Sequence, residues 1–529
     1  MEPDFQAAID MKKKGVLLIA FLLAFVRMSA PDEDLWAISL DKVNSIVSIL
    51  EDSYYKDLDS EKLAYASIHG LLDTLDPHSY FLEPENFARM REDYVGKYYG
   101  LGIQIQKQED RLVVIAPIEG TPAWRLGVQP GDVISHINGE TTKPISSFDA
   151  MQKLRGEKGT KVDITLVREG FDKPIELTVI REEIPLYSVP YAFMLDNSVG
   201  YIFIRTFAEY TDRELQEKLA KLSGLGMKSL ILDLRGNTGG PLVSSIEVSD
   251  EFLPKGALVV SIRGRNRSYN KDFWALRDEQ FEKLPLVVLI DQGTASASEI
   301  VSGAVMDNDR GLVVGHDSWG KGLVQTIFPL SSNMAVAITT AKYLTPSGRA
   351  IQRDFSHIED YLMGKQAPAE SREIKYTLKG RKVLGQGGIA PDYEVAVSLK
   401  PLTFELMVKG LFFAYARKLV QHQTELAGRF VFPQDRGAKA DAAGKIVVGD
   451  VFAAGPEVLE DFKSYLRAVK IPFDEAKFKE AGDEVRREIE REIASALWGV
   501  EEGIRAYRRS DPVVAKALEV MPEAAKFIE

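Results

Sequence analysis

Two short segments of this chain hold side chains that could perform covalent chemistry. Thr294-Ala-Ser-Ala-Ser-Glu299 lies between an apolar stretch and a helical one, so a small-residue turn there could expose a serine hydroxyl. Lys321 follows Ser296 by 25 residues and has no acidic residue nearer than Asp317. A serine hydroxyl needs a base, and a neutral lysine can be that base if burial lowers its pKa from about 10.4. These residues could therefore supply a nucleophile and a general base.

Each of these side chains also has a purely structural interpretation. Ser296 or Ser298 could be the N-cap of the following helix, with Glu299 adding a favourable charge to its first turn. From this segment alone, the cap is the favoured interpretation. A Ser-His-Asp triad would have to recruit a distant histidine, with His316 beside Asp317 as the candidate, because the chain has no G-x-S-x-G elbow.

The lysine segment also fits the pattern of a nucleotide-binding loop. Gly315 to Lys321 matches G-x-x-x-x-G-K, but such a loop needs a following Ser or Thr for Mg²⁺ and a helix that holds the phosphates. Here Gly322 follows, and residues 323–329 alternate like a strand. The sequence therefore argues against a nucleotide site.

The composition narrows the remaining classes of function. The chain has 529 residues, no cysteine, 6 histidines and a net charge of −12. The lack of cysteine excludes disulfides, thiolate metal sites and a cysteine nucleophile, and the histidines are too scattered for a local metal cluster. The acidic balance argues against nucleic-acid binding, which needs a basic surface. We expect no metal and no cofactor.

The elements that would position the serine and the lysine lie in the middle of the chain. Near-continuous apolar strands alternate with helices between residues 198 and 345, which predicts a layered α/β core. The predicted strands are 199–204, 229–234, 286–290 and 312–314, and the predicted helices are 212–222, 242–252 and 297–306. The serine would then lie between a buried strand and a helix.

The regions before and after this core have different hydrophobic patterns. Residues 35–95 show helical periodicity, and short alternating strands with Gly and Pro turns follow. The predicted strands of this β-rich module are 101–106, 112–116, 132–137, 162–167 and 175–180, with a helix at 147–155. Residues 353–384 are predicted to form an insertion or a flexible arm. After residue 401 the chain is helical again, with an apolar stripe that would pack on the core or form an oligomer interface, comprising Leu402, Leu406, Leu411 and Phe412.

The first 30 residues have the pattern of an export signal. Met11-Lys-Lys-Lys14 precedes an apolar run, residues 15–26, that is too short to span a bilayer comfortably. The cleavage region is imperfect, with Met28 and Ala30 at the small-residue positions, so an uncleaved N-terminal anchor is the alternative. In both cases we expect an exported protein of the bacterial periplasm or cell envelope.

From roughly residue 35 to 400, the chain resembles the carboxyl-terminal processing (tail-specific) serine peptidases. Residues 294–300 resemble their nucleophile segment Ser-Ala-Ser-Ala-Ser-Glu-Ile with one change, and residues 319–325 resemble their Phe-Gly-Lys-Gly-x-Val-Gln segment. The resemblance implies that Ser296 is the nucleophile, Lys321 the base and Gln325 the residue that orients the lysine. If residues 321–325 form a strand, the lysine and glutamine lie on one face.

The resemblance also bears on three other polar residues. His316 stands where the family carries an acid, which argues against a histidine-based triad. Asp307 and His78 match family positions that we interpret as structural.

The resemblance extends to a glycine-rich loop. Residues 233–240 resemble the family's Asp-Leu-Arg-x-Asn-Pro-Gly-Gly, with Thr238 in place of the proline. The resemblance implies that the backbone N–H of Gly240, or of Gly239, joins that of Ala297 in an oxyanion hole. Without the family resemblance, the glycine pair would be interpreted as a simple turn.

The β-rich module resembles a PDZ domain. The similarity lies in an ordered set of glycine turns across about 40 residues, between Gly100 and Gly139. Backbone N–H groups of such a turn can bind a terminal carboxylate while the peptide adds as a strand to the sheet edge. The resemblance implies that substrate binds at Gly100, Leu101, Gly102 and Ile103.

The whole sequence predicts a mixed α+β and α/β multidomain protein. The expected parts are a signal or anchor (1–30), a helical region (31–95), a PDZ domain (96–182), a peptidase core (183–400) and a helical C-terminal region (401–529). We expect a serine endopeptidase whose partners are proteins or peptides with free, apolar C-termini. The C-terminal helices could mediate self-association or bind an adaptor. The alternative is an inactive PDZ scaffold or adaptor of the cell envelope.

Overall fold

The structure is a computed structural model that describes residues 33–528, except 119, 169, 197, 279–280, 331–332, 367, 398, 433–445 and 448–450. It divides into two compact units, one ending at Thr74 and the other beginning at Leu75. The first unit contains α2 (Glu33–Ser53) and α3 (Ser60–Leu72). The predicted export signal lies outside the described residues. Within the described part of the chain, no helix is long and apolar enough to cross a membrane.

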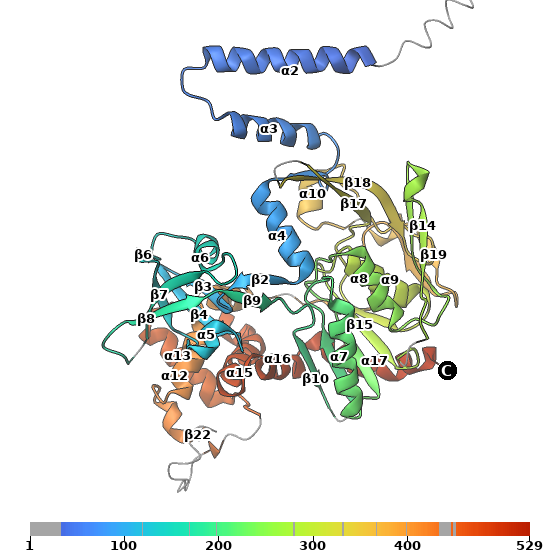
Figure 1. Cartoon of the computed structure of the whole chain (residues 1–529). Coiled ribbons are helices and arrows are strands. Elements are labelled where there is room, and N and C mark those ends of the chain that lie inside the picture. The colour runs from blue at the N-terminus through green and yellow to red at the C-terminus, as the bar shows by residue number, and fades with distance from the viewer. Residues whose placement is uncertain are drawn as a thin grey trace, which may run out of the picture. The chain divides into compact units, whose positions relative to one another are not determined.

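A six-stranded sheet forms the centre of the second unit (Figure 1). All neighbouring strands are parallel except β10, which lies antiparallel at one edge. In spatial order the strands are β10 (Tyr191–Met194), β11 (Val199–Phe203), β12 (Ser229–Asp233), β15 (Leu286–Ile290), β16 (Leu312–Gly315) and β21 (Tyr393–Glu394). Every residue of β12, β15 and β16 is buried, as expected for a parallel sheet covered on both faces. The predicted layered core is confirmed.

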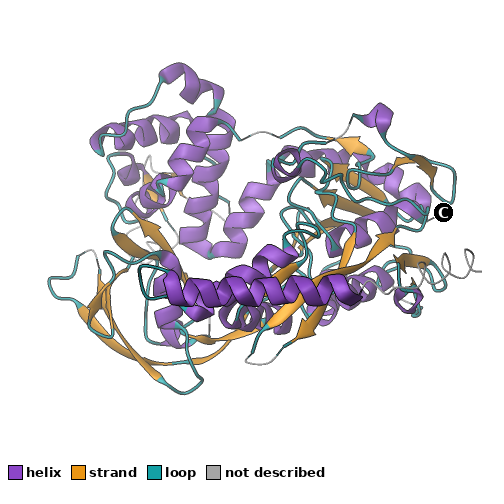
Figure 2. Ribbon diagram, turned by 90° about the horizontal axis from the view of Figure 1, so that it is seen from above, coloured by secondary structure: helices purple, strands orange, loops and turns teal. Residues whose placement is uncertain are grey.

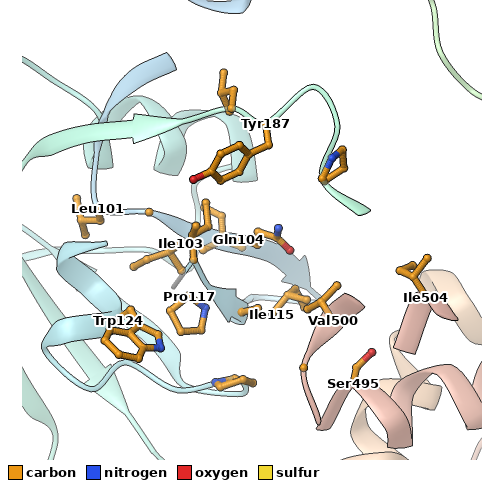
Figure 3. Close-up of a pocket in the computed structure, with 18 of the residues that line it drawn as sticks. Leu101, Ile103, Gln104, Ile115, Pro117, Trp124, Tyr187, Ser495, Val500 and Ile504 are labelled. Atoms are coloured by element: carbon orange, nitrogen blue, oxygen red, sulfur yellow. The ribbon is translucent and has the colours of Figure 1, made fainter. Parts of the chain in front are cut away.

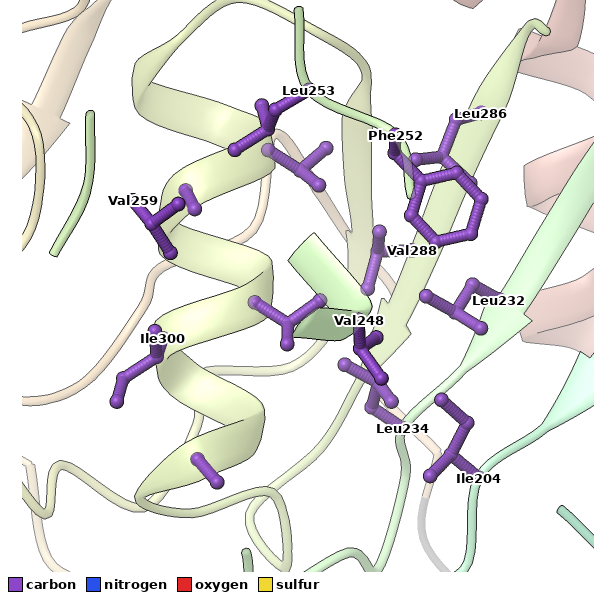
Figure 4. Packing of buried hydrophobic residues seen from close by; sticks show 14 of the residues in the cluster. Ile204, Leu232, Leu234, Val248, Phe252, Leu253, Val259, Leu286, Val288 and Ile300 are labelled. Carbon is purple, nitrogen blue, oxygen red and sulfur yellow. The ribbon is translucent and has the colours of Figure 1, made fainter. Parts of the chain in front are cut away.

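Three helices cover one face of this sheet. They are α7 (Thr211–Gly224), α8 (Leu242–Asp250) and α9 (Ala297–Asp307), and their bounds differ from the predicted ones by a residue or two. Alternate strand residues point toward these helices, because successive side chains of a strand face opposite ways. Figure 4 shows Leu232 and Val288 on the strands packed with Val248 and Phe252 of this layer.

The opposite face of the sheet is covered by the last long helix of the chain, α17 (Pro512–Ala524). Its buried residues pack against the other set of alternate strand residues, represented by Ile231, Val287 and Leu289. The helix contributes Val513, Val514, Ala517, Val520, Met521 and Ala524 to this cluster. The peptidase sheet therefore takes half of its hydrophobic cover from a helix more than 100 residues beyond the predicted end of the core.

A buried cluster of charges ties α17 to strand β12. Arg235 donates to Asp233 (Nη2–Oδ2, 2.6 Å) and lies 2.8 Å from a carboxylate oxygen of Asp511, the N-cap of α17. Arg508 pairs with Asp511 at 2.9 Å and donates to the hydroxyl of Tyr201 at 2.8 Å. Burial alone would raise the pKa of Asp233, but Arg235 and Arg508 hold it at about 2. The cluster is ionised and internally paired.

A second sheet carries the lysine segment. Its strands are β1 (Tyr80–Leu82), β13 (Leu258–Gly264), β14 (Lys271–Trp274), β17 (Leu323–Pro329) and β18 (Ala335–Leu344), with the long β18 paired to β1, β13 and β17. Helix α4 (Pro84–Val95) follows β1. Part of the predicted insertion is ordered, because α10 (Ile358–Leu362) and the hairpin β19 (Ile374–Tyr376) and β20 (Lys382–Leu384) lie within it.

The β-rich module is an antiparallel sheet in the order β3-β4-β5-β7-β8. Its strands are β3 (Ile103–Gln108), β4 (Arg111–Pro117), β5 (Val133–Ile137), β6 (Glu140–Thr141), β7 (Lys161–Val167) and β8 (Ile175–Ile180), and its helices are α5 (Pro122–Arg125) and α6 (Ser147–Leu154). Strands β2 (Lys97–Gly100) and β9 (Glu182–Pro185) pair where the chain enters and leaves the module. The five predicted strands are confirmed within a residue or two.

The C-terminal region is mainly helical and has its own hydrophobic cluster. Figure 2 distinguishes the helices of the whole chain, in purple, from the strands, in orange. It contains α11 (Pro401–Val408), α12 (Leu411–Val420), α13 (Pro456–Ala468), α14 (Glu475–Glu480), α15 (Gly482–Trp498) and α16 (Val500–Arg509). The four residues of the predicted apolar stripe are all buried in this cluster. Self-association and adaptor binding stay predictions, as do the domain boundaries.

We predict that Asp511→Asn destabilises the folded chain by about 3 kcal/mol, because it leaves two buried arginines with one carboxylate while preserving the N-cap oxygen. Denaturant unfolding followed by tryptophan fluorescence measures this change. Glu519→Gln, on the same helix, is the matched control, because Glu519 is 67% exposed and its pair with Lys516 contributes little. Equal stabilities of the two variants would contradict the role of the charge cluster.

Candidate active site

Ser296 lies at the turn between strand β15 and helix α9, where it is the N-cap residue. Its backbone angles, φ 57° and ψ −114°, are rarely adopted by residues other than glycine and mark a locally strained turn. Ser296 is only half-buried, whereas its neighbours Ala295 and Ala297 are buried. The turn therefore presents the Ser296 side chain at the edge of the core.

The other hydroxyls of the segment have structural roles. Ser298 is fully buried and donates to the carbonyl oxygen of Asn237 (3.0 Å), and Thr294 donates to the carbonyl oxygen of Leu234 (2.9 Å). The N-cap interpretation is correct for the position of Ser296. Its backbone N–H donates to Glu299, as in a capping box (2.7 Å). Ser296 is therefore the N-cap residue of α9 and is also exposed enough for its hydroxyl to take part in chemistry.

The carboxylate of Glu299 is the point where the serine and lysine segments meet. It is fully buried and accepts four hydrogen bonds. Oε2 accepts from the backbone N–H groups of Ser296 (2.7 Å) and Lys321 (2.9 Å). Oε1 accepts from the Ser318 hydroxyl (2.5 Å) and from the N–H of Gly320 (2.7 Å). Burial raises the pKa of Glu299, and these donors oppose that rise.

Tyr343 joins the same two segments from the other side. It lies on β18 and is buried, and its hydroxyl contacts the carbonyl oxygens of both Ser296 (3.1 Å) and Lys321. The sequence indicates neither role, because the pattern around Glu299 predicts only a favourable charge in the first turn of a helix and no motif singles out Tyr343. Only their contacts reveal that they hold the serine and lysine backbones together.

The side chain of Lys321 is largely enclosed. Within the described chain, its amine makes no hydrogen bond or ion pair. Burial lowers the pKa of Lys321, and the negative charges of Glu299 and Asp76 partly oppose this effect. The same positive charge acts on His78, whose pKa burial and Lys321 lower to about 4. The environment therefore favours a neutral amine more than water does.

Gln325 lies on β17, and its side chain contacts Thr339 of β18 rather than Lys321. Lys321 precedes β17, and a bulge between Val324 and Gln325 interrupts the register with β18. The amide nitrogen of Gln325 donates to the Thr339 hydroxyl at 3.4 Å, and Thr339 donates to Asp76 at 3.0 Å. No hydrogen bond joins Gln325 to Lys321 in the described structure.

Gly239 lies directly against the serine turn, and Gly240 lies against Phe207. A Cβ on Gly239 would come within 2.9 Å of the Ala297 nitrogen, and one on Gly240 would come within 2.1 Å of the Phe207 carbonyl oxygen. Both glycines have positive φ, 100° and 152°. The N–H of Gly239 is bound by the Asn237 side chain (2.9 Å), whereas those of Gly240 and Ala297 have no acceptor among the described residues.

Asn237 is a further residue whose importance was not evident from the sequence. It is fully buried in the loop after β12. Its carbonyl oxygen accepts from the N–H of Ala295 (2.9 Å) and from Ser298, and its side-chain nitrogen donates to Ile204 (2.9 Å). The glycine loop and the serine turn are therefore held together by one asparagine.

Three residues considered in the sequence lie in structural settings. His316 is 35% exposed and 3.8 Å from Glu394. Asp307 is fully buried with Arg349, at 2.7 Å. His78 hydrogen-bonds the hydroxyl of Tyr361 (2.7 Å), on α10. No group of three His, Asp or Glu residues suited to a metal ion occurs among the residues described.

The predicted peptide-binding turn lies between β2 and the edge strand β3. The carbonyl oxygens of Leu101 and Gly102 accept from the N–H groups of Ala123 (3.1 Å) and Ile118 (2.8 Å), which holds the turn open. The N–H groups of Leu101 and Gly102 themselves donate to no described residue. Gly102 has φ 77°, and a Cβ there would come within 2.4 Å of Thr121, so a side chain would not fit.

Comparison with known proteins now identifies the family. Residues 198–360 match the family model described as Peptidase family S41, and residues 113–168 match that of the PDZ domain. The carboxy-terminal-processing protease of Bartonella bacilliformis is 37% identical over 343 residues, which cover 64% of this chain and 78% of the relative. This chain belongs to the carboxy-terminal processing proteases. It is therefore a serine peptidase with a PDZ domain.

Another curated relative and two solved structures are similar to different shares of this chain. The carboxyl-terminal-processing protease of Synechocystis is 37% identical over 314 residues, 58% of this chain and 72% of the relative. The solved photosystem II D1 C-terminal processing protease is 28% identical and covers 67% of this chain and 88% of its own, with a TM-score of 0.37. The PDZ domain of a Vibrio cholerae carboxy-terminal protease, solved with a peptide, is 28% identical over 17% of this chain and 99% of its own, with a TM-score of 0.16.

We predict that Tyr343→Phe lowers peptidase activity about tenfold or more, because the carbonyl groups of Ser296 and Lys321 lose their shared donor and the two backbones can shift apart. The stability loss should be about 1 kcal/mol, typical of one hydrogen bond. Peptide hydrolysis rates and denaturant unfolding measure both quantities. Tyr415→Phe is the control, because it removes another buried hydroxyl, bound to Asp461 in the C-terminal cluster. Equal activities would contradict the positioning role of Tyr343.

Proposed function

We propose that this protein is an endopeptidase that recognises protein C-termini through its PDZ domain and cleaves them with a Ser296–Lys321 dyad. The observation that carries the proposal is the convergence of both backbone N–H groups on a single oxygen of Glu299. A buried carboxylate that binds both segments keeps the nucleophile and the base in one place without taking part in the chemistry.

The arrangement supports an acyl-transfer mechanism. Ser296 Oγ attacks the scissile carbonyl carbon while the neutral amine of Lys321 takes the hydroxyl proton. The C–N bond then breaks, the lysine ammonium gives its proton to the leaving amine, and Ser296 holds the acyl group as an ester. Water hydrolyses this ester, with Lys321 again accepting a proton. No metal or cofactor is required at any step.

Two unused backbone donors are available to the tetrahedral intermediate. The N–H groups of Gly240, which follows the glycine packed against Ser296, and of Ala297, which follows Ser296, have no acceptor among the described residues. As the family resemblance implies for this loop, they would stabilise the negative charge that develops on the carbonyl oxygen. Gly239 is the poorer choice, because its N–H is bound by Asn237. We therefore assign the oxyanion hole to Gly240 and Ala297.

Gln325 would orient the lysine through its amide oxygen. Its amide nitrogen already donates to Thr339, which fixes the side chain and leaves the oxygen without a donor in the described structure. A rotation of the Lys321 side chain toward this oxygen would complete the interaction. The role rests on the family resemblance, supported by this free acceptor.

Substrate capture would use the turn from Gly100 to Ile103. The free N–H groups of Leu101 and Gly102 can bind a terminal carboxylate, and β3 offers a sheet edge to which an extended peptide can add. Leu101 is buried and Ile103 half-buried, so an apolar terminal side chain fits this environment. Export to the periplasm or cell envelope rests on the sequence pattern of the first 30 residues.

We expect Ser296→Ala and Lys321→Ala each to reduce the degradation of a test protein with an apolar tail by at least about a thousandfold. The reason is that one variant lacks the nucleophile and the other the base. Gel-based degradation assays measure the rates. His316→Ala should retain most activity, because His316 contacts Glu394 rather than the serine turn. Degradation by the serine or lysine variant at the parental rate would refute the dyad and support an inactive scaffold.

The pH dependence of kcat/KM should be a single rise through the pKa of Lys321. The neutral amine is the active form, so activity is lost as pH falls below that pKa. Burial lowers the pKa from 10.5, which moves the rise toward neutral pH. Hydrolysis of a peptide without titratable side chains, measured from acid to alkaline pH, tests this. A limb near pH 6.5 that disappears in His316→Ala would instead show histidine catalysis.

A further inference from the structure

A large cavity lies between the PDZ sheet and the C-terminal helices (Figure 3). Its volume is about 1050 Å³, enough for several residues of an extended peptide. One wall comes from the PDZ domain and includes Leu101, Gly102 and Ile103. The facing wall includes Arg417 of α12 and Val500 of α16. The cavity that contains the proposed carboxylate-binding turn is thus completed by a region outside the PDZ domain.

Helix α12 is fitted against the PDZ domain at two points. Gly131, in the turn before β5, has φ 86°, and a Cβ there would lie 1.4 Å from a guanidinium nitrogen of Arg417, so the arginine packs directly on this turn. At the start of the helix, a Cβ on Gly410 would lie 2.5 Å from the side-chain nitrogen of Gln108. The guanidinium of Arg417 therefore lies against the PDZ domain at the cavity wall.

Four arginines and one acidic residue, Glu492, line the cavity. Arg155 and Arg491, which also line the cavity, have carboxylate partners at 2.9 Å and 2.8 Å. Arg205, a third, donates to the carbonyl oxygen of Tyr187 at 2.5 Å. Arg417 forms no ion pair with any residue that the structure describes, in a chain whose net charge is −12. An unpaired, half-buried guanidinium in such a chain is suited to a carboxylate that arrives with the ligand.

We infer that Arg417 is a specificity-determining residue of the peptide-binding cavity, and that it selects C-termini carrying an acidic side chain shortly before an apolar terminal residue. The inference rests on the proposed recognition of C-termini. The terminal carboxylate would bind the N–H groups of Leu101 and Gly102, and the chain would extend through the same cavity past Arg417. The C-terminal helices would thus supply part of the substrate specificity.

The test uses the full chain with Ser296→Ala, so that peptides bind without being cleaved. Fluorescent peptides with an apolar last residue carry either Glu or Gln at one preceding position, which is varied along the peptide, and each has a free or an amidated C-terminus. At the best position, we expect the Glu peptide to bind about three- to tenfold more tightly than the Gln peptide. Arg417→Gln should remove this preference.

Lys418→Gln is the matched control. It makes the same charge change on the same helix, but Lys418 does not line the cavity, so the preference should persist. Circular dichroism checks that both variants are folded. Equal binding of Glu and Gln peptides at every position, or an unchanged preference in Arg417→Gln, would overturn the inference alone. Equal binding of free and amidated termini would overturn the proposed C-terminus recognition, and this inference with it.

Discussion

The active site depends on one buried carboxylate. Glu299 is removed from solvent and would be costly to ionise without partners, yet it accepts four hydrogen bonds from the serine turn and the lysine loop. Two of these donors are the backbone N–H groups of Ser296 and Lys321, so the proposed nucleophile and base cannot separate without breaking a satisfied network. Tyr343 and Asn237 extend this network to the opposite side of the serine turn and to the glycine loop.

The six-stranded sheet next to the candidate site explains why residues far apart in the sequence are needed to build this region. A parallel sheet must be covered on both faces, and α7, α8 and α9 cover only one of them. The other face is closed by α17, whose N-cap Asp511 shares buried arginines with Asp233 at the end of β12. The loop that carries Gly239 and Gly240 begins at that aspartate. The end of the chain therefore supports the same strand that leads into the proposed oxyanion hole.

The region between α11 and α16 serves a different surface. Its helices pack into a cluster of their own and face the PDZ sheet across the cavity that contains the Leu101–Gly102 turn. Glycines at 131 and 410 allow α12 to approach closely. The proposed peptide recognition and the support of the peptidase sheet thus involve successive parts of the C-terminal region.

The sequence by itself determined the class of chemistry, the layered core and most strand and helix bounds. These features depend on the types of neighbouring residues and on the period of the hydrophobic positions, which can both be read locally along the chain. It also indicated Ser296, Lys321 and the glycine pair through short motifs. It could not show that Glu299 and Tyr343 join two segments, that Gln325 pairs with Thr339 across β17 and β18, or that α17 completes the core. Those facts arise from contacts between residues far apart in the chain, and only the packing of the tertiary structure decides which distant groups meet.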